Sequence, residues 1–268
     1  MHLVHPIEHL RYVARARGAD ATSLVREAAT ALASLRTDHA NLVIAGRRIV
    51  ERHPEVGALW WMCASLLTSD DPRARAWEIA DQIEADPTPR RLAAALPDGA
   101  VVLTIGWPEL GGAGLMSRGD VRVLCADSRY EASGFLQRLE RYDVECEPVP
   151  AESIARAAAA SDVVLVEAVA ASQTRALAPV GSHVVAAVAH SVGAPVWLVA
   201  GVGRRLPTEY VDAIASRVGG RTAGWDVDVD DLPLALVTHV VTEDGLAEVA
   251  TLRPNCPFAP ELLRTSPF

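Results

Sequence analysis

The sequence predicts an α/β fold: a helical N-terminal domain, residues 1–95, followed by a Rossmann-like domain with a doubly wound, mainly parallel sheet, residues 96–268. Two observations lead to this prediction. Apolar residues recur at helical spacing up to about residue 92, whereas after Gly99 short apolar runs alternate with amphipathic segments. A chain of 268 residues can bury such a core without disulfides or metal ions.

The N-terminal region is expected to form a helical bundle or cap. Its first helix carries an apolar stripe of Leu24, Ala28, Ala31 and Leu35. Three further helices are expected at residues 38–52, 56–67 and 72–85. The second of these four helices should stop at His53-Pro54, because proline cannot continue a helix.

The region after Gly99 has the alternation of βαβ units. Strands are expected at residues 100–104, 121–126, 143–147, 162–166, 196–200 and 236–241, and helices at 131–141, 151–160, 182–192 and 207–216. Ligands of doubly wound folds bind beyond the carboxyl ends of the strands. The loops after residues 104, 126, 166 and 200 are therefore the places to look for a site.

Composition excludes several classes of protein. No apolar stretch approaches the roughly 18 residues of a membrane span, and the N-terminus lacks a signal peptide, so we expect a cytoplasmic protein. The four cysteines lack metal-site spacing and are expected to be buried thiols, with no metal and no cofactor. A net charge of −9 argues against direct nucleic-acid binding, although Arg47-Arg48 and Arg204-Arg205 offer local contacts for anions.

A glycine-rich loop over residues 106–114 follows the first expected strand. Its backbone N–H groups are suited to approach a phosphate or carboxylate closely, or it simply turns the chain. It is neither a P-loop nor a G-x-G-x-x-G turn. The sequence also lacks G-x-S-x-G and H-E-x-x-H, which removes support for the common hydrolase and metalloprotease classes.

Two segments with arginine suit anion binding. Asp127-Ser128-Arg129 ends the second expected strand, where Arg129 can contact a phosphate, or the segment is a turn capped by Asp127 or Ser128. Arg17-Gly18-Ala19 precedes the first helix, where it forms an anion site or an exposed linker.

Seven short motifs occur in one order along most of the chain. They are R-G-A at 17–19, V-L-T at 102–104, a D-S-R segment at 127–129 with Gly134 beyond it, D-V-V-L-V at 162–166, V-G-S at 180–182, G-A-P-V-W at 193–197 and V-T-E-D-G at 241–245. Together they resemble the family of the alpha, beta and delta subunits of eukaryotic translation initiation factor 2B. Methylthioribose-1-phosphate isomerase and ribose-1,5-bisphosphate isomerase are relatives in that family.

The resemblance implies a helical domain before a Rossmann-like domain, assembly as a homodimer, and binding of a phosphorylated ribose or nucleotide. The ligand-binding residues that it implies are Arg17, Gly18, Ala19, Thr104, Gly106, Asp127, Ser128, Arg129, Gly181 and Ser182.

This sequence departs from the isomerases at their catalytic positions. Gly106 stands where the resemblance implies a cysteine, and Val169 stands where it implies an aspartate. Pro179 replaces a lysine of the motif that precedes the later helix. Glycine and valine side chains neither donate nor accept a proton.

Three functions follow as hypotheses. The leading one is a non-catalytic relative that binds a phosphorylated ribose or nucleotide as a sensor or an assembly subunit. The second is an aldose–ketose isomerase of a ribose phosphate that uses the displaced residues Cys125 and Glu167. The third is an interaction scaffold without a ligand, whose pocket is plugged by Trp107.

Overall fold

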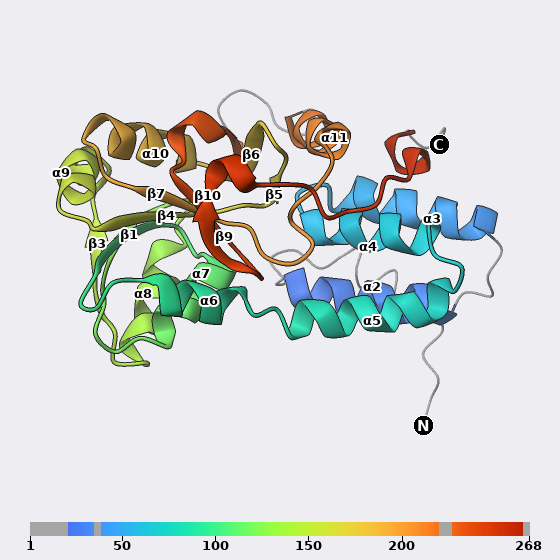
Figure 1. Cartoon of the computed structure of the whole chain (residues 1–268), viewed down its shortest axis with the longest axis horizontal. Coiled ribbons are helices and arrows are strands. Elements are labelled where there is room, and N and C mark those ends of the chain that lie inside the picture. The colour runs from blue at the N-terminus through green and yellow to red at the C-terminus, as the bar shows by residue number, and fades with distance from the viewer. Residues whose placement is uncertain (1–20, 35–38, 220–226, 265–268) are drawn as a thin grey trace.

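A computed structural model describes residues 21–34, 39–219 and 227–264 of the chain. Figure 1 shows two parts side by side: a helical bundle formed by α2 to α5, and a twisted sheet with helices on both faces. The predicted fold class is confirmed. Arg17, Gly18, Ala19 and Leu35 lie outside the described residues.

The helical part contains four helices among the described residues, close to the predicted ranges. They are α2 (Ala21–Ser34), α3 (His39–Arg52), α4 (Gly57–Leu67) and α5 (Pro72–Glu84). Helix α4 is apolar on all sides and is buried between its neighbours. Helix α5 begins where the Asp71 carboxylate accepts a hydrogen bond from the N–H of Ala74 (3.0 Å), with Pro72 at the first helical position.

The main sheet has the strand order β10-β9-β7-β4-β1-β2-β3. Its strands are β1 (Val101–Ile105), β2 (Arg122–Ala126), β3 (Glu145–Val149), β4 (Val163–Glu167), β7 (Val196–Val199), β9 (His239–Thr242) and β10 (Gly245–Glu248). The six strands that the sequence predicts are parallel to one another, and β10, which it does not predict, adds an antiparallel edge. The chain leaves β1 in one direction and returns to its other side with β4, so the strand order reverses between β1 and β4.

Helices cover the sheet in two layers. On one face lie α6 (Thr88–Ala95), α7 (Glu109–Met116) and α8 (Ala132–Glu140), and on the other lie α9 (Ile154–Ala159), preceded by η1 (Ala151–Ser153), and α10 (Ser182–Ser191) (Figure 1). Alternate β4 residues pack against the two layers. Val163 and Leu165 face the layer of α6 to α8, while Val164 and Val166 face the layer of α9 and α10. Burial on both faces explains why this strand is a continuous apolar run.

A smaller sheet, β5-β6-β8, joins the two parts of the molecule. It consists of β5 (Ala170–Ala171), β6 (Arg175–Pro179) and β8 (Val229–Pro233), and α11 (Thr208–Gly219) packs beside it. Tyr210 of α11 and Leu177 of β6 share one core with Trp60 of α4. The remaining short helices are η2 (Leu234–Leu236), η3 (Val249–Thr251) and η4 (Pro260–Leu263).

The predicted glycine-rich loop is wrong for most of its length, because Glu109–Met116 is helix α7. Each glycine costs about 1 kcal/mol in a helix relative to alanine, but here the missing side chains permit close packing. A Cβ on Gly112 would lie 2.7 Å from the Phe135 ring, and one on Gly114 would lie 2.8 Å from the Pro89 carbonyl oxygen. The glycines bring α7 against its neighbours.

The prediction also missed α6, the antiparallel strand β10 and the smaller sheet. Helix α6 falls within residues 1–95, yet its Leu92 packs in the core beneath the main sheet. The division of the chain into residues 1–95 and 96–268 stays a prediction.

Candidate functional site

A cavity of about 200 Å³ opens at the point where the strand order reverses. The segment after β1 contributes Trp107 and Glu109, and the end of β4 contributes Glu167 and Val169. The segment before α4 lines the opposite side. Arg204, from the segment after β7, completes the lining. The cavity therefore lies where doubly wound folds bind ligands, at three of the four loops singled out from the sequence.

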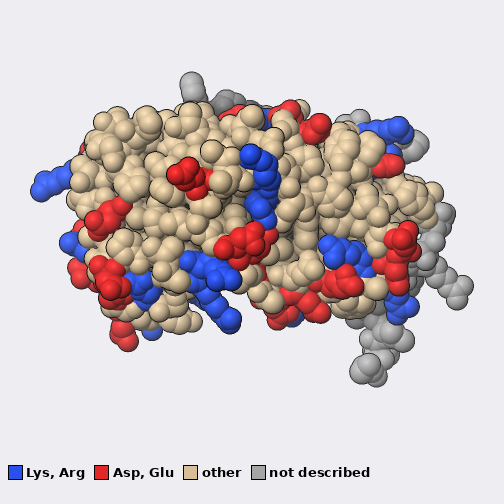
Figure 2. Space-filling view, viewed as in Figure 1, with Lys and Arg blue, Asp and Glu red and all other residues tan. Residues whose placement is uncertain are grey.

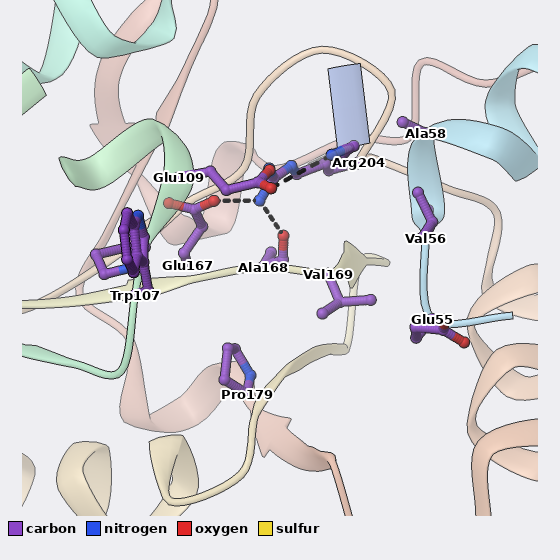
Figure 3. Close-up of a pocket in the computed structure, with 13 residues that line it drawn as sticks. Glu55, Val56, Ala58, Trp107, Glu109, Glu167, Ala168, Val169, Pro179 and Arg204 are labelled. Carbon is purple, nitrogen blue, oxygen red and sulfur yellow. Dashed lines mark hydrogen bonds and ion pairs between the residues drawn. The ribbon is translucent and has the colours of Figure 1, made fainter. Parts of the chain in front are cut away.

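Arg204 is the central charged group of this cavity. Its guanidinium donates to Glu167 Oε1 (2.6 Å), to the Ala168 carbonyl (2.8 Å) and to Glu109 Oε2 (3.2 Å). Figure 3 shows these three acceptors grouped around it. Burial lowers the pKa of Arg204, but the negative charges of Glu167 and Glu109 outweigh burial and raise the pKa. Arg204 therefore stays charged.

Glu167 is held on both carboxylate oxygens. Besides Arg204, the backbone N–H of Gly111 in α7 donates to Glu167 Oε2 (2.8 Å), and the side chain is only 7% exposed. Both oxygens serve as hydrogen-bond acceptors that fasten α7 and the segment after β7 to the end of β4. Both Glu167 oxygens therefore already have partners within the protein.

The space beside Gly106 is already filled. A Cβ there would lie 3.1 Å from Ser128 Cβ and 3.5 Å from Glu131 Oε2, and Gly106 has a φ of +62°. Both the left-handed backbone and the contacts disfavour a side chain at this position. A cysteine here, where the resemblance implies one, would have to adopt the left-handed backbone and displace Ser128 by a few tenths of an ångström.

Val169 and Pro179, the other two positions at which the sequence departs from the isomerases, also lie at the cavity. Val169 and Pro179 face the same space from different sides (Figure 3). Trp107 lines the cavity too, but its ring packs over Gly134 and lies 6.2 Å from the Phe135 ring, and it is 40% exposed. Open volume remains beside it.

Cys125 lies apart from the cavity. Its side chain is buried within β2, where Sγ donates to the carbonyl of Gly106 (3.4 Å). Burial, followed by the charge of Asp127, raises the pKa of the Cys125 thiol to about 12. Cys125 and Glu167 each have other partners, and no contact joins them among the described residues.

The predicted phosphate segment 127–129 is occupied by internal contacts. Asp127 accepts from the N–H of Ala132 (3.1 Å) at the start of α8, and the Ser128 hydroxyl donates to the Val180 carbonyl (2.8 Å). Arg129 forms an ion pair with Asp228 (2.9 Å). Arg129 and Tyr130 have φ values of +55° and +66°, and the Glu131 N–H donates to the Ser128 carbonyl (3.0 Å), so this segment is a tight turn.

The predicted residues at the start of α10 are likewise engaged. Gly181 has a φ of +93°, and its N–H donates to the Asp230 carboxylate (2.8 Å), as does the N–H of His183 (3.1 Å). The hydroxyl groups of Ser182 and Thr104 are buried without a hydrogen-bond partner among the described residues.

Sequence reasoning missed three acidic residues of the site. Glu109 belongs to the segment predicted as a loop, and Asp228 and Asp230 are not among the predicted site residues. Their spacing of two residues before an apolar segment was a usable signal, since alternate residues of an extended chain point the same way. Arg204 is a predicted anion contact, and the anions that it contacts are the Glu109 and Glu167 carboxylates of its own chain.

The described ranges contain neither a metal-binding cluster nor a membrane-spanning helix. No three His, Cys, Asp or Glu side chains there lie close enough together to hold a metal ion, and no helix there is long and apolar enough to cross a membrane. The cysteines are free thiols: Cys63 and Cys125 are buried as expected, but Cys146 and Cys256 are partly exposed.

No family model matches the chain, and no curated protein matches its sequence. Solved structures do match. The translation initiation factor eIF-2B of Pyrococcus horikoshii OT3 superposes with a TM-score of 0.73 at 18% identity, over 91% of this chain and 96% of that one. For eIF2B beta of Chaetomium thermophilum the TM-score is 0.72 at 16% identity, over 92% and 89%.

A third match is the tetrameric eIF2B-beta2-delta2 complex of C. thermophilum, with a TM-score of 0.72 at 17% identity, over 92% of this chain and 91% of that one. At these identities the matches establish the fold, and they agree with the resemblance seen in the sequence motifs. The chain has the fold of the subunits of translation initiation factor 2B.

Proposed function

We propose that this chain is a non-catalytic, initiation factor 2B-like subunit that acts in the cytoplasm by associating with other protein chains. The observation that carries the proposal is the backbone and surroundings of Gly106. Its φ of +62° favours glycine, and a Cβ there would lie 3.1 Å from Ser128 Cβ, so both disfavour a catalytic side chain at this position. Val169 and Pro179 add no acid or base to the cavity.

The isomerase alternative needs a proton donor and acceptor on neighbouring sugar carbons. Glu167 has both oxygens bound by Arg204 and Gly111, and Cys125 is a buried thiol that lines neither cavity. These contacts favour a structural role for both residues.

Association is supported by the outer surface of α10. Val184 and Val192 are 57% and 44% exposed, and the surface over α9 and α10 is mostly uncharged in Figure 2. One of the solved structures with this fold is a tetrameric complex of beta and delta subunits. We therefore expect a homodimer in which α10 takes part.

Sedimentation velocity tests the association. The purified full chain should sediment as a dimer or larger species, and Val184→Asp should shift it towards the monomer. Val249→Asp, a substitution of a partly exposed valine in η3, serves as the control. A monomer at every concentration would contradict the assembly role.

Proton exchange tests the absence of catalysis. In heavy water, ribose 1,5-bisphosphate and methylthioribose 1-phosphate should keep their C2 protons in NMR spectra when the protein is added. Exchange that is lost in Glu167→Gln would establish the isomerase alternative instead.

A second candidate is a sensor of a phosphorylated ribose or nucleotide. It is favoured by the exposure of the Arg129–Asp228 pair, in which the side chains are 45% and 58% exposed, so that solvent reaches both groups. Ribose phosphates and nucleoside monophosphates should then raise the melting temperature. This stabilisation should disappear in Arg129→Ala.

A further inference from the structure

A second, larger cavity of about 700 Å³ lies beside the first, between the end of α5 and the outer sides of α7 and α8. The two cavities share Trp107, Glu109 and Arg204 in their walls. The volume lies in the range of small-molecule sites. Leu110 and Met116 of α7 supply part of its apolar lining.

Most charged groups in this lining have a partner. Glu109 pairs with Arg204, and Glu84 contacts Arg26. Asp86 accepts hydrogen bonds from the backbone N–H groups of residues 88 and 202, both 2.9 Å away. These groups maintain the walls of the cavity.

Two charged groups in the lining remain unmatched. Within the described ranges, Glu131 has no ion-pairing partner and Arg138 has no hydrogen bond or ion pair. Burial raises the pKa of Glu131, and a hydrogen bond from the backbone of Trp107 lowers it by a smaller amount. The Glu131 side chain is exposed at the cavity, and the charge of Arg129 also lowers the pKa of its carboxyl.

These opposite charges are separated along one helix. Glu131 directly precedes α8 and Arg138 lies in its last turn, seven residues on, so their backbones are about 10 Å apart at 1.5 Å per residue. At the Glu131 end stands Trp107, whose indole is 40% exposed. An aromatic face beside a carboxylate suits a protonated amine, which gains both charge pairing and cation–π attraction.

We propose that this cavity binds a small zwitterion whose ammonium group lies against Trp107 and Glu131 and whose carboxylate pairs with Arg138. The three groups line one cavity and present complementary charges at its two ends. The site is independent of the association proposed above, because neither Glu131 nor Arg138 belongs to α10.

Three probes with one six-carbon chain separate the contributions: 6-aminohexanoate carries both charges, hexylamine only the cation and hexanoate only the anion. Calorimetric titration of the full chain should rank their affinities in that order. Glu131→Gln should weaken 6-aminohexanoate about tenfold, the effect of losing one charge-assisted hydrogen bond. Arg138→Gln should reduce its affinity to that of hexylamine.

Glu140→Gln and Arg141→Gln provide matched controls, since they remove the same charges from equally exposed positions at the end of α8 that do not line the cavity. Both should bind 6-aminohexanoate as the unmodified chain does. The proposal is overturned if no probe binds, if hexanoate binds as well as hexylamine, or if the control variants lose as much affinity as the test variants.

Discussion

The Asp230 carboxylate accepts a hydrogen bond from the backbone N–H of Gly181, 2.8 Å away, at the first turn of α10. Helix N-termini attract anions because their N–H groups are unpaired and the helix dipole is positive there. Here the anion is part of the chain. Asp228, two residues earlier, neutralises Arg129 in the same region. Arg129, which the resemblance assigns to a ligand phosphate, and the N–H of Gly181, which it assigns to ligand binding, thus have partners within the chain.

Removing the Asp230 carboxylate should expose this anion site. We expect Asp230→Ala to lose about 1 kcal/mol of stability, the usual effect of losing a helix cap. We also expect inorganic phosphate to stabilise the variant more than the unmodified chain, which urea unfolding with and without phosphate will measure. Asp231→Ala removes the neighbouring carboxylate, which pairs with Arg175. It should lower stability without any gain from phosphate.

A side chain at Gly106 should cost more than its backbone conformation alone. Gly99 has a similar φ of +67° with nothing near its missing Cβ, so Gly99→Ala reports the left-handed backbone, about 1–2 kcal/mol. Gly106→Ala should cost at least about 1 kcal/mol more, because of the contact with Ser128. Equal losses in chemical denaturation would mean that the space beside Gly106 is open.

Tyr130 should be replaceable with a gain in stability. Its φ is +66° and its side chain is 92% exposed, so glycine relieves backbone strain and gives up few contacts. Allowing for the flexibility of glycine in the unfolded chain, Tyr130→Gly should gain about 0.5–1 kcal/mol. Tyr142→Gly, at an exposed tyrosine without a positive φ, should lose stability in the same unfolding assay.

The buried Cys125 thiol should make stability fall at high pH. Its pKa rises from 9.0 to about 12 on folding, so the folded chain keeps a proton that the unfolded chain releases between these values. Stability is complete below pH 9 and decreases towards pH 12, by about 1.4 kcal/mol per pH unit for one proton. The sequence contains no lysine, which leaves cysteine and tyrosine as the main side chains that titrate there.

Cys125→Ala should make the curve of unfolding free energy against pH shallower there by the contribution of one proton. The contribution of Cys63, whose pKa burial also raises to about 12, should remain. Alkylation of the folded chain at pH 9 should modify the partly exposed Cys146 before Cys125. If the unfolding free energy of Cys125→Ala depended on pH as that of the unmodified chain does, the Cys125 thiol would have the same pKa in the folded and unfolded chains.

Periodicity was sufficient to predict the elements that are buried on a regular pattern. The six parallel strands and the four helices predicted among them lie within three residues of their expected positions. In β4, burial on both faces leaves the continuous apolar run Val163–Val166. The smaller sheet was missed because β5 has only two residues and β8 is rich in aspartate and proline. Such strands depend on partners distant in sequence.

The site was predicted in position but not in its charge pairing. The strand-end rule located the loops that carry Trp107, Glu167 and Arg204. That Arg204 would face Glu167 rather than a ligand depends on how the segment after β7 lies against β4. Local patterns contain no information about that contact.

The glycines of α7 change what a retained glycine would mean in related chains. Gly112 and Gly114 look like a loop that wraps a phosphate, but their hydrogen atoms are the points at which Phe135 and Pro89 touch the helix. These two positions set the spacing of α7 from α8 and α6 within one layer of helices. A glycine preserved there in related chains would record how closely these helices pack, and it would persist after every trace of catalysis had gone.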